Sequence, residues 1–267
     1  MRYTSRFLVL AAFTVLALFL APKSGWASQC VAYVDSQVGP SPVSYSQSQS
    51  GNGVDITFVT HSTFRLVTPA GVVVATDFAG YAGDGPLPDI VTMNHAHETH
   101  YTLFPDPKIK HVLTGWNPEG GPIEHSLRVA DLYLRNVPTD IRRPGGTVEP
   151  FGNSIFIFEV ADLCIGHLGH LHHKPTPEQL ARIGRLDVVF APVDGSVTLD
   201  LKSMIEVLLD LRASLVIPMH FFSYQTLEIF LAAMSQAFDV RIADSDSVSV
   251  SLANLPRDPT VLLLAGY

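Results

Sequence analysis

The chain has 267 residues, of which 47% are hydrophobic and 16% are charged, so it is long and apolar enough to bury a full core. This composition excludes an intrinsically disordered chain and a small disulfide-stapled domain. The formal net charge of −8 argues against a protein that follows a phosphate backbone, so we expect no nucleic-acid partner.

The first 27 residues have the layout of a secretory signal peptide. Arg2 and Arg6 precede an uncharged apolar run over residues 7–21, FLVLAAFTVLALFLA, and the sequence GWA at 25–27 supplies a small-residue cleavage site. A membrane anchor is the alternative, but the run is shorter than the ~20 apolar residues that a spanning helix needs. We therefore expect cleavage after Ala27 and a periplasmic or secreted protein that is not retained in the membrane.

Two regions follow the predicted cleavage site. Residues 28–53 are rich in Ser, Gln, Pro and Gly and are predicted to be flexible, whereas residues 54–267 are predicted to form one domain. The chain has 2 cysteines, Cys30 in the first region and Cys164 in an apolar run. In an oxidising compartment they could form a disulfide, or they could remain a free thiol and a buried core residue, and both alternatives stay open.

Short β-rich runs alternate with turns in the first part of the domain and are predicted to form antiparallel hairpins. These expected strands are 55–60, 65–67, 72–75, 90–93, 111–114, 131–137, 154–158 and 163–166. Beyond them, predicted helices at 176–183, 200–211 and 227–238 are interspersed with continuous apolar strands at 186–191 and 215–219. Strands that are apolar throughout belong to a sheet covered on both faces, so we expect a single α/β domain.

Eight of the 11 histidines fall in three places, and each place directly follows an apolar strand. They are His95, His97 and His100 after DIVTM; His167, His170, His172 and His173 after LCIG; and His220 after LVIPM. Because strand ends can meet at one edge of a sheet, these side chains are predicted to converge there. Imidazole is the commonest metal ligand, so the pattern predicts a metal site. His111 and His125 are predicted to be isolated core or surface residues.

In order along the chain, NHAHETH, HLGH and PMH resemble the metallo-β-lactamase superfamily, whose first motif is His-x-His-x-Asp-His. More narrowly, HLGHLHHKPTPEQLARIGRLDVVFAPVDG followed by VIPMH is similar to the branch that includes ascorbate-6-phosphate lactonase-like proteins. The runs ITFVTHSTFRL and VVVATD are similar to the same branch, so the resemblance covers about residues 54–222. It implies an αββα sandwich with a metal site at one edge, between two sheets.

The resemblance also implies a set of ligands. His95 and His97 match the pair that holds the first metal, and His100 matches the histidine of the second metal. His220 matches the last ligand. Asp77 matches an acidic residue that supports the ligands from behind, a role that fixes the imidazole tautomer.

Three positions depart from the family pattern. Thr99 stands where the motif has its aspartate, and a hydroxyl is a poor ligand for zinc. His170 stands in the place of the bridging aspartate, where it can hold one metal but cannot bridge two. The stretch NVPTDIRRPGG lacks the usual third histidine of the first metal, and Asp140 is the nearest replacement. These departures weaken the expected two-metal site and the bridging hydroxide on which the family's hydrolysis depends.

The expected site therefore consists of histidines. The predicted metal ligands are His95, His97, His100, His170 and His220. His61, His167 and His173 are expected to be structural or supporting residues and His172 an exposed one. Glu98 is expected to be solvated or salt-bridged, and a general base beside the metal is the alternative. Zinc is the expected cofactor, as one or two ions, and iron or manganese are the alternatives.

Two functions are consistent with this site. The first is an exported metal-dependent hydrolase, in which a metal-bound water attacks an ester, lactone or phosphodiester bond of a small-molecule substrate. The alternative is a non-catalytic metal-binding or accessory protein of the cell envelope, which keeps the fold but has a degenerate site. The sequence assigns neither a catalytic residue nor an oligomeric state.

Overall fold

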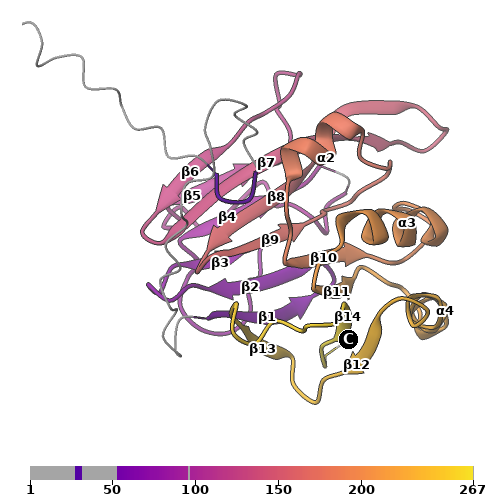
Figure 1. The fold of residues 1–267 in the computed structure, drawn as a ribbon. Coiled ribbons are helices and arrows are strands. Elements are labelled where there is room, and N and C mark those ends of the chain that lie inside the picture. The colour runs from indigo at the N-terminus through magenta and orange to yellow at the C-terminus, as the bar shows by residue number, and fades with distance from the viewer. Residues whose placement is uncertain (1–27, 32–52, 96, 267) are drawn as a thin grey trace, which may run out of the picture.

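A computed structural model describes residues 28–31, 53–95 and 97–266 (Figure 1). The predicted signal peptide and residues 32–52 of the predicted flexible region lie outside the described residues. Within the described ranges, no helix combines the length and the apolar character that crossing a membrane requires. The strands of the described chain form two β-sheets, and a layer of helices packs beside them.

The first sheet has six strands in the order β13-β1-β2-β3-β4-β5. Their bounds are β1 Val54–Thr60, β2 Thr63–Val67, β3 Val73–Ala75, β4 Ile90–Met93, β5 His111–Thr114 and β13 Ser247–Val250. Strands β1, β2 and β3 pair antiparallel, as predicted, whereas β3 with β4 and β4 with β5 pair parallel. The hairpin prediction is wrong for these two pairs, because the connections at 76–89 and 94–110 are long loops that return the chain to the other end of the sheet.

The second sheet has eight strands in the order β12-β14-β11-β10-β9-β8-β7-β6. Their bounds are β6 Ser126–Val129, β7 Leu132–Arg142, β8 Val148–Val160, β9 Leu163–His167, β10 Val188–Pro192, β11 Leu215–Met219, β12 Asp239–Ile242 and β14 Thr260–Leu263. Strands β6 to β9 pair antiparallel, and β9, β10, β11, β14 and β12 pair parallel. Strands β7 and β8 are longer than predicted, and they form a hairpin whose turn lies at 143–147.

The three predicted helices are present as α2 (Pro177–Ile183), α3 (Leu201–Leu211) and α4 (Tyr224–Met234). Each begins at a polar side chain that accepts a hydrogen bond from a backbone N–H of the first turn. These capping residues are Thr176, Asp200 and Ser223. All three helices contribute to one core cluster with the eight-stranded sheet, and Figure 1 shows them on the same side of the molecule.

The apolar side chains form three clusters. The fully buried rings between the two sheets are those of Phe64, Phe156, Phe158 and Phe190, and the rings of Phe64 and Phe190 stack with their centroids 4.1 Å apart. A second cluster fills the space between the eight-stranded sheet and the helices. In the third cluster, loop residues such as Phe78 and Ile109 cover the outer face of the first sheet. The two-sheet α/β sandwich is thus confirmed, although in the described chain loops rather than helices cover that outer face.

The carboxyl ends of β1, β3, β4, β9, β10 and β11 lie at one edge of the sandwich, and the predicted site residues follow these ends. Three residues there have a left-handed backbone, with φ of 46° at His61, 49° at Asp77 and 52° at His220. Non-glycine residues adopt this conformation rarely, and such strain is concentrated at functional sites. Five other described non-glycine residues share this conformation, so the backbone strain supports the assignment of this edge but does not make it alone.

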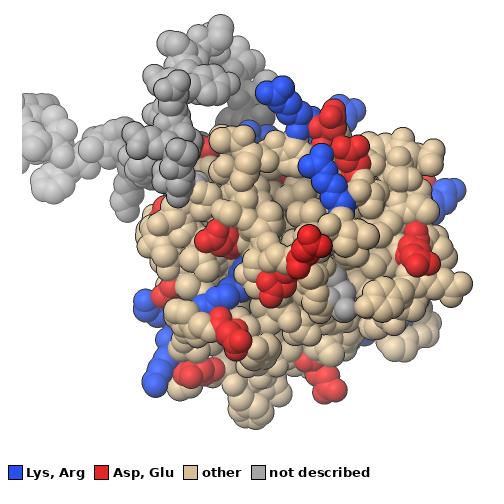
Figure 2. Space-filling view, turned by 90° about the horizontal axis from the view of Figure 1, so that it is seen from below, with Lys and Arg blue, Asp and Glu red and all other residues tan. Residues whose placement is uncertain are grey.

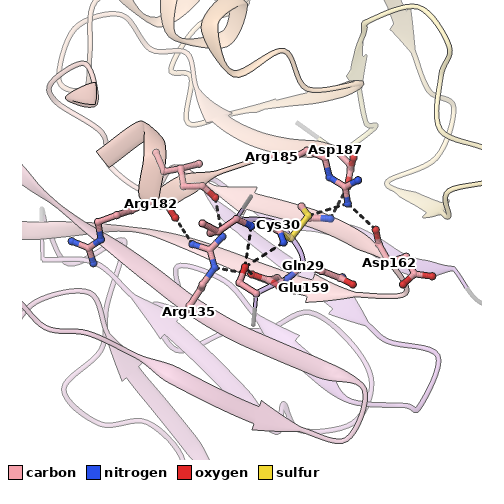
Figure 3. The surroundings of a disulfide bond; sticks show 12 residues. Gln29, Cys30, Arg135, Glu159, Asp162, Arg182, Arg185 and Asp187 are labelled. Carbon is pink, nitrogen blue, oxygen red and sulfur yellow. Dashed lines mark hydrogen bonds and ion pairs between the residues drawn. A yellow bond between two sulfur atoms is a disulfide. The ribbon is translucent and has the colours of Figure 1, made fainter. Parts of the chain in front are cut away.

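Residues 28–31 are held on the second sheet by a disulfide between Cys30 and Cys164 of β9, with Cα atoms 5.9 Å apart (Figure 3). The backbone N–H of Arg185 donates to the carbonyl oxygen of Cys30 at 2.8 Å. Gly184 has a φ of 74°, and a Cβ at this position would lie 2.2 Å from the same oxygen, so only glycine fits. The disulfide alternative is therefore the one that the structure adopts, and residues 28–31 are part of the folded domain.

A buried ion pair lies beside the disulfide. Nε of Arg135 is 2.7 Å from Oε1 of Glu159, and the guanidinium also donates to the carbonyl oxygens of Arg182 and Ile183 at the end of α2. Glu159 accepts two further bonds, from the hydroxyl of Ser28 at 2.5 Å and from the backbone N–H of Gln29 at 3.0 Å. Each buried charge is compensated by several partners. Because these partners lie in different segments, the pair joins residues 28–31 to β7, β8 and α2.

Replacing both cysteines, Cys30→Ser with Cys164→Ser, should lower the free energy of unfolding by about 2–5 kcal/mol, because the disulfide closes a loop across 134 residues of sequence. Urea denaturation of the oxidised protein and of the double variant measures this difference. A reducing agent should destabilise the parent and leave the variant unchanged. Equal midpoints for the oxidised and reduced parent would show that the bond does not stabilise the fold.

Candidate metal centre

Four histidine side chains from three loops converge at the edge of the sandwich where the carboxyl ends of the strands lie. His97 and His100 come from the loop after β4, His170 from the loop after β9, and His220 follows β11 directly. One ring nitrogen of each lies within 4.8 Å of the corresponding atom of every other, and all of them except His97 are buried. The predicted convergence of the three histidine groups is thus observed for these four residues. A set of this kind could hold a metal ion.

His100 is oriented by a buried carboxylate. Its Nδ1 lies 2.6 Å from Oδ2 of Asp77, and neither side chain is exposed to solvent. The other carboxylate oxygen of Asp77 accepts a hydrogen bond from the side-chain amide of Asn94 at 2.9 Å. Burial raises the pKa of Asp77 and thus favours its neutral form, whereas a cation nearby would favour its charged form. With Nδ1 donating to the carboxylate, Nε2 of a neutral His100 carries a lone pair that faces the cluster.

His220 has a partner of the same kind in Asp194, which follows β10. Nδ1 of His220 lies 3.1 Å from Oδ2 of Asp194, and both side chains are shielded from solvent. Burial by itself would raise the pKa of Asp194, but hydrogen bonds from His220, Thr198 and the backbone N–H of Ser196 outweigh it and lower that pKa. A charged Asp194 therefore keeps the His220 proton on Nδ1 and leaves a lone pair on Nε2.

The two lone pairs point at each other. Nε2 of His100 and Nε2 of His220 are 3.2 Å apart, and with both protons on Nδ1 no hydrogen lies between them. Two acceptors at this distance repel unless a cation sits between them. Zinc–nitrogen bonds of about 2.0–2.1 Å at a tetrahedral angle separate two nitrogens by roughly 3.3 Å. The donor set and its spacing therefore fit a metal ion held by these two residues.

His97 and His170 have a different arrangement. The backbone N–H of Arg142 donates to Nδ1 of His172 at 2.9 Å, so a neutral His172 carries its proton on Nε2, which lies 2.5 Å from Nδ1 of His170. His170 then carries its own proton on Nε2, 3.0 Å from Nε2 of His97. A metal bound through Nε2 of His170 requires this proton to leave. His100 and His220 are thus the ligands prepared in advance, and His97 and His170 complete the set.

His61 lies against the cluster without joining it. Its ring centroid is 4.0 Å from that of His220, and its carbonyl oxygen accepts the backbone N–H of His220. Burial, together with the neighbouring histidines His220 and His100, lowers the pKa of His61 to about 3, so the ring is neutral. Among the described residues, Nε2 of His61 is a buried nitrogen without a hydrogen-bond partner. A buried lone pair or N–H left in this state usually indicates a missing ligand or water.

His95, a predicted ligand, is not brought into the cluster. Its ring stacks on Trp116 with centroids 4.8 Å apart, and its Nδ1 lies 2.8 Å from Oε1 of Glu149, which also pairs with Arg143. Thr99, in the place of the family's aspartate, has its hydroxyl 2.8 Å from Nδ1 of His97. The hydroxyl therefore orients a ligand.

The remaining predicted residues are placed as follows. Asp140 accepts the backbone N–H of Phe151 within the β7–β8 hairpin, away from the cluster, and Glu98 is exposed. His167 is buried and bridges the carbonyl oxygen of Ser62 to the backbone N–H of Gly169, which is a structural role. His173 is exposed. His172 was expected to be exposed, but this is wrong: it is 5% exposed, because the hairpin covers it and supplies its hydrogen-bond donor.

Two residues of the site were missed by sequence reasoning. Asp194 could have been found, because it directly follows a continuous apolar strand, as Asp77 does. Arg142 could not, because only the length of the β7–β8 hairpin brings it to His172.

Comparison with known proteins gives consistent matches. A family model described as the beta-lactamase superfamily domain matches residues 55–220. Over 232 residues the chain is 25% identical to a UPF0173 metal-dependent hydrolase from Anaeromyxobacter dehalogenans, a match that covers 71% of this chain and 84% of that protein. The curated relative is thus named for metal-dependent hydrolysis.

Solved structures share the fold. A proposed Zn-dependent hydrolase of the metallo-β-lactamase superfamily from Thermotoga maritima matches with a TM-score of 0.58 and 24% identity, over 79% of this chain and 98% of that chain. A proposed metal-dependent hydrolase from Parabacteroides distasonis matches with a TM-score of 0.53 and 16% identity, over 68% of this chain and 88% of that chain. The fold implied by the sequence resemblance is therefore confirmed.

The geometry ranks the histidines by their contribution to metal binding. His100→Ala or His220→Ala should abolish bound metal, and Asp194→Asn should weaken binding by about 10–100-fold, because the amide no longer fixes the ring of His220. Elemental analysis and titration with a competing chelator measure these losses.

Two histidines serve as matched controls. His173→Ala and His95→Ala should retain metal, since the first ring is exposed and the second lies against Trp116. Loss of metal in His95→Ala with retention in His220→Ala would reverse the ranking.

Proposed function

We propose that this chain, which belongs to the beta-lactamase superfamily, is an exported metal-dependent hydrolase that acts on an ester, lactone or phosphodiester of a small molecule. The family match covers more than half of the chain. Zinc is the proposed metal, as one or two ions, because the cluster offers neutral imidazole nitrogens, and iron or manganese are the alternatives.

The observation that carries the proposal is the close approach of the His100 and His220 rings. Their Nε2 atoms lie 3.2 Å apart, and each ring is fixed from behind by a carboxylate. Carboxylate–histidine pairs of this kind typically support metal ligands, since they set the tautomer and raise the basicity of the ring. A structural role alone would not require two buried acceptors to face each other.

A metal held here would supply Lewis-acid activation of a water molecule and of the carbonyl or phosphoryl oxygen of the substrate. The chain's own residues prepare the site for this chemistry. Asp77 and Asp194 keep protons on Nδ1 of His100 and His220, and the burial of both rings excludes bulk water from one side of the cluster.

A second candidate function is a non-catalytic metal-binding or accessory protein of the cell envelope. The observation in its favour is that none of the four clustered ligands is a carboxylate, so the cluster lacks the anionic bridge that holds two metals close together. Bound metal is expected for both functions. Turnover separates them.

Export is proposed on two grounds. The sequence has the layout of a signal peptide, and the disulfide between Cys30 and Cys164 is a bond that persists in oxidising compartments such as the periplasm or the extracellular space.

Zinc-loaded protein should hydrolyse at least one member of a panel that contains a p-nitrophenyl ester, an aliphatic lactone and bis-p-nitrophenyl phosphate. Activity should fall to background in His100→Ala and His220→Ala and persist in His173→Ala, because only the first two remove a clustered ligand. Full metal occupancy without turnover on any substrate, with zinc, manganese or iron, would favour the accessory function.

Protein expressed from the full coding sequence should be recovered from the periplasm or medium with Ser28 as its first residue. Intact-mass measurement and N-terminal sequencing test this, and Ala27→Phe should block cleavage because the site needs a small residue. A full 29.0 kDa chain retained in the membrane would contradict export.

A further inference from the structure

We infer that the cavity beside the histidine cluster binds an anionic group of the substrate, and that Arg142 is the residue that holds this group. The inference rests on the proposed hydrolase function and narrows its substrate class to molecules that carry a carboxylate or phosphate close to the bond that is hydrolysed.

The cavity has a volume of about 480 Å³ and opens directly on the cluster, because His97 and His170 line it. Its other walls are the turn of the β7–β8 hairpin, His172 and residues 196–197. The volume lies within the range of small-molecule sites. A substrate bound here would therefore reach the cluster and the hairpin at the same time.

The charge of the cavity differs from that of the rest of the protein. The formal net charge of the chain is −8, and the face in Figure 2 carries acidic and basic side chains interspersed on a largely uncharged surface. By contrast, the charged residues that line the cavity are Arg142 and Arg143, and no carboxylate is among its lining residues. Because charges of one sign in a cleft attract ligands of the opposite sign, the cavity favours an anion.

The two arginines differ in how their charge is compensated. Arg143 pairs with Glu149 on the facing strand of the hairpin. The guanidinium of Arg142 instead donates to the carbonyl oxygens of Ser196 at 3.4 Å and Thr198 at 3.2 Å, and in the described chain it forms no ion pair. Carbonyl oxygens occupy some of its N–H groups without neutralising its charge. Arg142 therefore keeps a full positive charge for a ligand.

Arg142 is also fixed at both ends. Its backbone N–H donates to His172, which contacts His170 of the cluster. Its side chain is held by the loop 196–198, and Asp194 organises that loop by accepting the backbone N–H groups of Ser196 and Thr198 while it orients His220. The cation and the metal ligands thus share one hydrogen-bonded framework, so an anion on Arg142 would lie in a set position relative to the cluster.

The chemistry of arginine defines the ligand class. A planar guanidinium matches the oxygens of a carboxylate or a phosphate and binds them through paired, charge-assisted hydrogen bonds. A neutral ester would gain no charge-assisted binding from Arg142.

The test measures anion binding by calorimetry, with inorganic phosphate and acetate as probes, in zinc-loaded and metal-free protein. Arg142→Ala should weaken binding of the preferred anion by about tenfold or more, the effect of removing a hydrogen-bonded charge. Arg142→Lys should retain part of the affinity. Arg241→Ala, which removes an exposed arginine that does not line the cavity, should bind as the parent does.

Tighter binding of phosphate would identify a phosphorylated substrate, and tighter binding of acetate a carboxylate. The loss caused by Arg142→Ala should persist in metal-free protein, which separates it from binding to the metal. Equal affinity of Arg142→Ala and the parent, or no binding of either probe by the folded parent, would overturn the inference. Because the readout is binding, an inactive protein would refute the proposed function alone, and an active hydrolase with unaltered Arg142→Ala binding would refute this inference alone.

Discussion

The contact on which the site depends is the hydrogen bond from an imidazole to a buried carboxylate, made once by His100 with Asp77 and once by His220 with Asp194. Each bond fixes which nitrogen is protonated, and together they force two lone pairs toward one point. The left-handed backbone at Asp77 and His220 places these groups, so part of the folding free energy is used to hold an arrangement that is unfavourable without a cation.

This arrangement also bears on the missing carboxylate ligands. A divalent cation surrounded by four neutral imidazoles would be a poorly compensated charge in a buried setting. Asp77 and Asp194 supply two negative charges immediately behind the ligands, one imidazole ring away from the cluster. Charge balance for one divalent ion is thus achieved without Thr99 or His170 being aspartate.

Most of the fold could be predicted from the sequence, because the strands with strong apolar character, such as 90–93 and 215–219, are buried on both faces. Strands β6, β12 and β13 were missed because their mostly exposed or partly buried side chains give no such pattern. Strand β14 was missed as well, since a run of four residues is too short to show a pattern. In the site, spacing correctly indicated which loops carry histidines. Spacing could not show that His97 joins the cluster and His95 does not, because two side chains that are two residues apart in a loop can point in different directions. The His95 ring is held away from the cluster by its contacts with Trp116 and Glu149.

The link between Cys30 and Cys164 has a consequence for how the chain reaches its native state. The 267 residues contain 2 cysteines, so within them a single pairing is possible and no incorrect disulfide has to be rearranged. Oxidation alone is sufficient, and a disulfide isomerase has no error within one chain to repair. The remaining hazard is an intermolecular disulfide. When the chain emerges N-terminus first, Cys30 is exposed before Cys164, and during that time it can react only with a thiol of another molecule.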